Sequence, residues 1–128
     1  MKQILAHVAI VVRDYDEAKD WYTRVLGFEL LEDSELGPGK RWVLVAPRGG
    51  GTSLLLARAA NDAQSSRIGN QTGGRVFLFL HTDDFERDYR RLLGHGVHFI
   101  EQPRYEQYGT VVVFEDLYGN RWDLIERK

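Results

Sequence analysis

Cysteine is absent from this chain of 128 residues, and its absence excludes disulfide bonds and thiolate chemistry. A bound metal ion would therefore be held by histidine, carboxylate or water ligands. No apolar run approaches the roughly 20 residues that a membrane-spanning helix needs. The opening stretch MKQILAHVAI also lacks the long apolar region and the cleavage site of a secretory signal. We therefore expect a cytoplasmic protein without a membrane partner.

Neither positive nor negative residues dominate the sequence. It has 17 Lys and Arg against 19 Asp and Glu, for a net charge of -2, and the two signs are mixed along the chain. Because no basic patch stands out, we expect no nucleic-acid partner. Hydrophobic residues make up 43% and charged residues 28%, which is the composition of a folded globular protein.

The two halves of the sequence repeat the same order of elements. Residues 7–12, HVAIVV, and residues 75–80, RVFLFL, are β-rich runs of equal length. Each leads into an acidic stretch, which is typical of a helix N-terminus. An apolar stripe at helical spacing follows, and a glycine is expected to end each helix. The first stripe comprises Ala18, Trp21, Tyr22, Val25 and Leu26, and the second comprises Phe85, Tyr89, Leu92 and Leu93.

Three further strands are predicted in each half. In the first half they lie at 28–32 (FELLE), directly after the glycine, and at 41–46 and 52–57. In the second half they lie at 97–101 (VHFIE), again after a glycine, and at 110–115 and 122–127. The pattern predicts an α+β fold of two tandem βαβββ modules that form a curled, cup-like mixed sheet. We expect one domain, residues 1–128, with module 1 at about 4–58, a linker loop at about 59–74 and module 2 at about 75–127.

Two polar residues stand inside apolar strands. His7 lies within ILAHVAIVV, and Asp123 lies between Trp122 and Leu124. His7 could be a half-buried histidine that is bonded to a backbone carbonyl. Asp123 could face solvent, because alternation along a strand places it on one face with Ile125. Periodicity alone does not decide the role of either residue.

The segments HVAIVVRDYDEAKDWYTRVLGFEL, at 7–30, and FEDLYGNRWDLIE, at 114–126, carry a family resemblance. Together with the order of the modules, they resemble the vicinal oxygen chelate superfamily, which includes glyoxalase I, extradiol dioxygenases, and fosfomycin- and bleomycin-resistance proteins. The resemblance spans nearly the whole chain. It implies the fold, but it does not by itself imply the reaction, since this scaffold hosts many chemistries.

The resemblance implies a divalent metal ion, Ni, Zn, Mn or Fe, in the cup formed by the strands. The metal would chelate two neighbouring oxygens of the substrate and act as a Lewis acid. Its ligands would come from the first and fourth strand of each module. Two of these positions fall on His7 and on Asp123, where relatives usually have Glu. Both side chains would then point into a wet cup rather than into a dry core.

The other two ligand positions depart from the family pattern. The strand at 52–57, TSLLLA, has no Glu or Gln, and the first strand of module 2 offers Arg75 or Phe77 where relatives commonly have His. His81 lies at the far end of that strand and is a substitute candidate. Zinc or nickel sites normally have three or four protein ligands, so this set is incomplete.

Two hypotheses remain open at this point. The first is a glyoxalase-like protein that acts on a small oxygenated molecule by metal-dependent lyase, isomerase or dioxygenase-type chemistry. The alternative is a metal-free binding or sequestration protein of the bleomycin-resistance type, with His7, Arg75 or Asp123 as polar anchors. Both hypotheses expect a homodimer, because the family commonly completes its cups by pairing modules across subunits. The residues predicted to contact the small molecule are Trp42, Arg75, Phe77, Phe79, His81 and Trp122.

Overall fold

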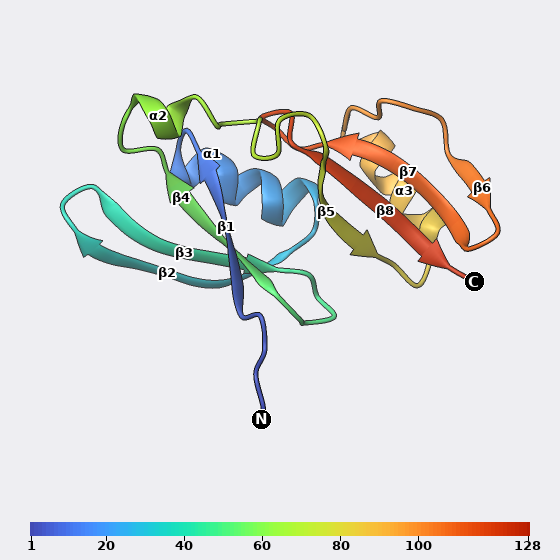
Figure 1. Cartoon of the computed structure of the whole chain (residues 1–128), viewed down its shortest axis with the longest axis horizontal. Helices are drawn as coiled ribbons and strands as arrows, with labels where there is room; N and C mark the ends of the chain where they lie inside the picture. The colour runs from blue at the N-terminus through green and yellow to red at the C-terminus, as the bar shows by residue number, and fades with distance from the viewer. The chain divides into compact units, whose positions relative to one another are not determined.

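The computed structural model describes residues 1–128, which form two compact units, Met1–Ile68 and Gly69–Lys128 (Figure 1). The first unit contains β1 (His7–Val12), α1 (Tyr15–Asp20), the π-helix η1 (Trp21–Val25), β2 (Glu29–Gly37), β3 (Lys40–Ala46), β4 (Ser53–Arg58) and α2 (Asp62–Ser65). The second unit contains β5 (Val76–His81), α3 (Phe85–Gly94), β6 (Arg104–Glu106), β7 (Gly109–Glu115) and β8 (Arg121–Arg127). No helix is both long enough and apolar enough to cross a membrane.

Each unit carries one four-stranded mixed sheet. The strand order is β1-β4-β3-β2 in the first unit and β5-β8-β7-β6 in the second. The first and last strands of each module pair in parallel, and all other pairs are antiparallel. This arrangement confirms the predicted α+β fold of two tandem modules with curled, mixed sheets.

The first unit's helix begins and packs as its sequence indicates. Asp14 precedes α1 in an extended conformation, and its side chain accepts a hydrogen bond of 2.8 Å from the amide of Glu17. This bond satisfies one of the amides that have no partner within the first turn. Tyr15 and Ala18 are buried, and α1 packs against β3 and β4. From Trp21 onward the helix widens to the π form of η1, which the sequence pattern did not predict.

In the second unit, β8 helps to start the helix. Asp84 caps α3 by accepting from the amide of Arg87 at 3.1 Å. The Glu126 carboxylate of β8 accepts from the amide of Phe85 at 2.6 Å, at the positive end of the helix. A chain of ring contacts then links the helix to the sheet, and it runs through Phe85, Tyr89, Phe99, Phe114 and Trp122. These aromatic side chains form the core on the helix side of the sheet.

The strand predicted at 97–101 is absent from the structure. Only Phe99 pairs there, in an isolated bridge to Phe114, and the next strand is the short β6. The Glu101 carboxylate accepts from the amide of Val113 at 3.1 Å, so a side chain takes a backbone donor that a continuous strand would use. The predicted linker is also more ordered than expected, because Asn61 caps the short helix α2 within it.

The turn between β7 and β8 is a closed hydrogen-bonded unit. The Asp116 carboxylate accepts from the backbone amides of Tyr118 and Asn120 and from the Asn120 side chain, all at 2.9 Å. The Asn120 side-chain oxygen accepts in turn from the amide of Gln71 at 3.3 Å. Asp116 and Asn120 are 5% and 3% exposed, so this part of the family-like segment holds the fold rather than a ligand.

Candidate functional site

Each sheet has one face that its own helix leaves uncovered. In the first unit, Ile10 and Val12 of β1 lie under the helix and are fully buried, whereas alternate residues point the other way. We call this other surface the first face. It carries His7, Ala9 and Val11 from β1, Trp42 and Leu44 from β3, and Ser53, Leu55 and Ala57 from β4.

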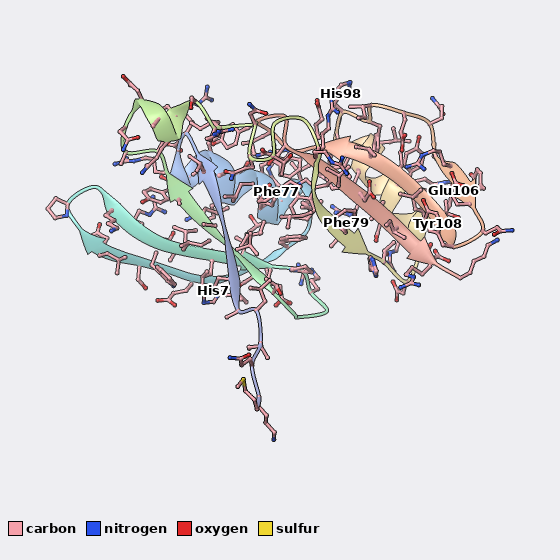
Figure 2. All side chains as sticks on the ribbon, viewed as in Figure 1. His7, Phe77, Phe79, His98, Glu106 and Tyr108 are labelled. Atoms are coloured by element: carbon pink, nitrogen blue, oxygen red, sulfur yellow. The ribbon has the colours of Figure 1, made fainter.

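His7 is held on the first face by its neighbour in the sheet. It pairs with Ser53 across β1 and β4, and its Nδ1 lies 2.6 Å from the Ser53 hydroxyl oxygen. The same hydroxyl lies 3.1 Å from the carbonyl oxygen of Ala6, and Ser53 is only 3% exposed. The Trp42 ring meets the imidazole edge-on, with centroids 5.9 Å apart. The His7 side chain is therefore fixed, although the residue is exposed (Figure 2).

In the second unit, Trp122 and Leu124 point toward the helix, so Asp123 points to the opposite surface, which we call the second face. Asp123 stands between Phe79 of β5 and Val113 of β7 in the register of the sheet. The second face carries Phe79 and His81 from β5, Val111 and Val113 from β7, and Asp123 and Ile125 from β8.

The Asp123 carboxyl group is an unsatisfied acceptor. Its Oδ1 atom is buried and has no hydrogen-bond partner in the chain. Burial raises the pKa of this carboxyl. The positive charge of the nearby Arg104 opposes the rise, whereas the negative charge of Glu101 adds to it. A buried polar atom without a partner is rare in folded proteins, and it marks a place where a ligand could supply the missing bond. Phe79, which pairs with Asp123, is 62% exposed and offers an apolar surface beside it (Figure 2).

Glu101 and Arg104 are functional candidates that the sequence analysis missed. Arg104 Nε lies 3.1 Å from a Glu101 carboxylate oxygen, and its guanidinium also reaches Glu106 at 3.3 Å. Both groups act electrostatically on Asp123. Glu101 ends the strand predicted at 97–101 and Arg104 follows that strand, and no spacing in the sequence places either residue beside β8.

The other predicted contact residues fall in different settings. His81 is exposed at the end of β5, opposite Ile125, and Arg75 is exposed just before that strand. Phe77 is half-buried at a bulge, where the pairing register of β5 with β8 shifts. Trp122 is 3% exposed and stacks on Phe114 in the helix-side core, so it supports the second face from behind.

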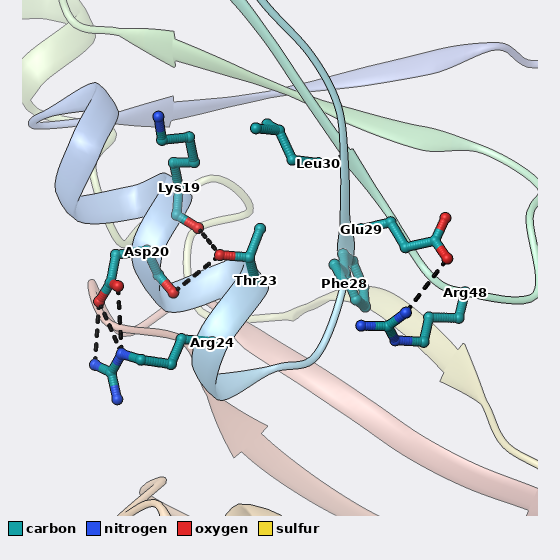
Figure 3. Close-up of a pocket in the computed structure, with 8 residues that line it drawn as sticks. All are labelled: Lys19, Asp20, Thr23, Arg24, Phe28, Glu29, Leu30 and Arg48. Atoms are coloured by element: carbon teal, nitrogen blue, oxygen red, sulfur yellow. Dashed lines mark hydrogen bonds and ion pairs between the residues drawn. The ribbon is translucent and has the colours of Figure 1, made fainter.

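A separate hollow opens on the first unit beside the π-helix (Figure 3). Its charged groups are already paired, since Arg24 reaches Asp20 at 3.0 Å and Arg48 reaches Glu29 at 3.4 Å. It contains no histidine, its Thr23 hydroxyl donates to a backbone carbonyl, and its Lys19 amine is paired with Asp33 at 2.8 Å. The lining residues are Lys19, Asp20, Thr23, Arg24, Phe28, Glu29, Leu30 and Arg48.

The donor set does not fit a metal ion of the kind that the resemblance implies. The residue that pairs with His7 is Ser53, and the residue that pairs with Asp123 is Phe79. At these paired positions each unit offers one strong ligand, His81 lies one pair farther along the second face, and neither unit gathers three or more His, Asp or Glu side chains in a metal-holding group. Structural and catalytic zinc sites use three or four protein ligands. No chemical step through a metal follows from these residues.

The chain is similar to one family of known proteins. The sequence profile described as Glyoxalase/Bleomycin resistance protein/Dioxygenase superfamily matches residues 4–124. An uncharacterized protein of Shewanella frigidimarina is 57% identical over 98% of this chain and 95% of its own length. The protein YetH of Bacillus subtilis is 31% identical, with 94% of each chain covered.

Solved structures extend the comparison. The crystal structure of UcmS2 superposes with a TM-score of 0.84 at 31% identity, with 98% of each chain covered. TnmS3, described as an antibiotic binding protein from Streptomyces sp. CB03234, superposes with a TM-score of 0.78. It is also 31% identical, and the match covers 100% of this chain and 98% of TnmS3.

Proposed function

We propose that this chain, which belongs to the glyoxalase/bleomycin resistance protein/dioxygenase superfamily, binds and sequesters a small molecule without a catalytic metal ion. The observation that carries the proposal is the pairing of each strong donor with a residue that cannot complete a metal shell. His7 pairs with Ser53, and Asp123 pairs with Phe79. The similarity to TnmS3, an antibiotic binding protein, supports the same conclusion.

The two faces define the chemistry of the ligand. Both are mainly apolar and carry an aromatic ring, Trp42 on the first face and Phe79 on the second, so a partly aromatic molecule suits them. Each face also has one polar anchor, His7 or Asp123. Phe77, His81 and Arg75 extend the surface along β5 and at its start. A small molecule with hydrogen-bonding groups on an apolar body would satisfy these features.

A metal-dependent enzyme is the second candidate function. One observation favours it: His7 uses Nδ1 for Ser53, and Asp123 Oδ1 has no partner, so each unit keeps one strong ligand atom free of protein partners. Ni, Zn, Mn and Fe remain the metals to test. This candidate needs further ligands from water, from His81 or from the substrate, because no group of three or more His, Asp or Glu side chains is present.

Both candidates favour a homodimer. β1 and β2 are the edges of one sheet and β5 and β6 are the edges of the other, and unpaired strand edges are commonly covered by a partner. Leu30 and Leu31 of β2 are 45% and 53% exposed, which adds apolar surface to one of these edges. Analytical ultracentrifugation tests this part of the proposal directly.

The decisive experiment compares ligand and metal binding by the same protein. Thermal unfolding is followed with bleomycin, doxorubicin and a panel of other antibiotics, with and without EDTA, and metal content is measured after purification without affinity-tag metal. We expect saturable stabilisation by at least one antibiotic, unchanged by EDTA; a ligand at about 100 times its Kd stabilises by about 2.7 kcal/mol. His7→Ala and Asp123→Ala should weaken the stabilisation by the antibiotic, whereas His95→Ala, in an exposed turn, should leave it unchanged.

The opposite result would support the enzyme. Stoichiometric metal that is lost in both His7→Ala and Asp123→Ala, together with no antibiotic binding, would contradict the metal-free proposal. A screen of substrates with neighbouring oxygen atoms would then follow.

A further inference from the structure

The hydroxyl of Ser53 lies between two polar atoms of its neighbours and carries only one proton. Its oxygen lies 2.6 Å from His7 Nδ1 and 3.1 Å from the carbonyl oxygen of Ala6. A carbonyl oxygen can only accept, and a neutral imidazole nitrogen can either donate or accept. The two contacts are both hydrogen bonds in one arrangement only: Ser53 donates to Ala6, and His7 Nδ1–H donates to Ser53.

The reverse arrangement leaves an unfavourable contact. If Ser53 donated to Nδ1, its oxygen would face the Ala6 carbonyl oxygen without a proton between them. Ser53 is 3% exposed, so water cannot easily relieve such a contact. The backbone amide of Ser53 also donates to the Ala6 carbonyl at 3.0 Å, which fixes the position of that oxygen next to the hydroxyl.

From this geometry we propose that Ser53 is a positioning residue, which holds His7 in its Nδ1–H form and presents the unprotonated Nε2 on the first face as a hydrogen-bond acceptor. The inference rests on the proposed function and narrows its ligand class. The ligand carries a hydroxyl or N–H donor on an apolar, aromatic body, and this donor meets His7 Nε2. Trp42 beside His7, and the next pair along this face, Ala9 and Leu55, provide apolar contact for that body.

The chain offers a matched control for Ser53. The adjacent Thr52 hydroxyl also donates to a backbone carbonyl, that of Leu5, at 2.8 Å, but no contact joins it to His7. Ser53→Ala removes the acceptor of Nδ1–H, Ser53→Thr keeps a hydroxyl, and Thr52→Ala removes a comparable bond elsewhere. Amide spectra of each variant establish that it is folded before any histidine signal is interpreted.

The tautomer is measured by long-range ¹H–¹⁵N correlation of the histidine rings above the pH at which they are protonated. The chain has four histidines, and loss of a signal in His7→Ala assigns the one of interest. We expect the Nδ1–H form in the wild type, in Ser53→Thr and in Thr52→Ala, and a shift toward the Nε2–H form in Ser53→Ala. A wild-type Nε2–H form, or a tautomer unchanged in Ser53→Ala, would overturn the role of Ser53.

The ligand class is tested with two probes, 2-naphthol and 2-methoxynaphthalene, of which only the first has a donor. We expect 2-naphthol to shift the His7 Nε2 resonance and to bind about 3- to 10-fold more tightly, the effect of one net hydrogen bond. The preference should fall in Ser53→Ala and persist in Thr52→Ala. Equal affinity, or no effect of either probe on His7, would overturn the ligand class. The tautomer result does not depend on any ligand, so its failure is distinct from failure of the antibiotic-binding proposal.

Discussion

Replacing Gly69 by alanine is expected to destabilise the second unit strongly, because the backbone there leaves no room for a side chain. Gly69 has a φ of 76°, in the left-handed region, and a Cβ added to it would lie 1.9 Å from the carbonyl oxygen of Tyr118. The obstacle is backbone, which cannot rotate away as a flexible side chain can. The turn that Tyr118 belongs to is itself closed by Asp116.

The magnitude follows from two contributions. Placing alanine in the left-handed region costs about 1 kcal/mol. Relieving the clash requires the segment at Gly69 to move away from the turn, and this movement breaks the bond from the Gln71 amide to Asn120, which adds about 1 kcal/mol or more. We therefore expect Gly69→Ala to lower the free energy of unfolding by at least about 2 kcal/mol.

Gly73→Ala separates the two contributions. Gly73 has a φ of 69°, close to that of Gly69, but an added Cβ would meet nothing within 4 Å. It should therefore cost only the backbone contribution of about 1 kcal/mol. Urea unfolding followed by circular dichroism measures both variants against the wild type. Equal destabilisation by the two substitutions would refute the argument that contact with the turn at Tyr118 fixes Gly69.

Three further predictions concern charged side chains, each measured by urea unfolding. Hydrogen bonds from Arg41, and then from Lys19, lower the pKa of Asp33 from its ordinary 3.8 to about 2. The contribution of these bonds to folding stability is therefore complete above pH 4 and is lost as the pH falls toward 2. Asp33→Asn should lower the free energy of unfolding by about 1 kcal/mol at pH 7 and abolish this pH dependence. Asp123→Asn should raise stability at pH 7, since burial of a partnerless carboxyl raises its pKa and disfavours the charged form; a loss would indicate an unseen favourable contact of the charge. Glu126→Gln should cost about 1 kcal/mol by weakening the bond to the start of α3, and a change within error would assign that capping role to Asp84 alone.

The order of elements could be predicted because hydrophobic periodicity records which face of each element is buried. The prediction of a strand at 97–101 was wrong for a local reason, because the Glu101 side chain accepts from the amide of Val113 in place of a backbone carbonyl. The π form of η1 also escaped prediction, because its apolar stripe is equally compatible with an α-helix.

The candidate site was only partly predictable. His7 and Asp123 stood out as polar residues in apolar strands, but period-2 alternation could not say which face Asp123 occupies. In the structure Trp122 is buried against Phe114 on the helix side, so Asp123 lies on the opposite face of the sheet. Ser53 could not be found in this way, since its contact with His7 depends on the register of a parallel pair that is 46 residues apart in sequence.

The two modules place their strong donor side chains on different strands. His7 pairs with Ser53 between the first and last strands of module 1, and Phe79 pairs with Asp123 between the first and last strands of module 2. The strong donor of the pair stands on the first strand in module 1 and on the last strand in module 2. The partners of the two donors differ, too: Ser53 satisfies the inner nitrogen of His7, whereas Phe79 leaves the oxygen of Asp123 without a partner. The two modules therefore present different chemistry, a pre-oriented acceptor on one face and an unsatisfied carboxyl beside an exposed ring on the other.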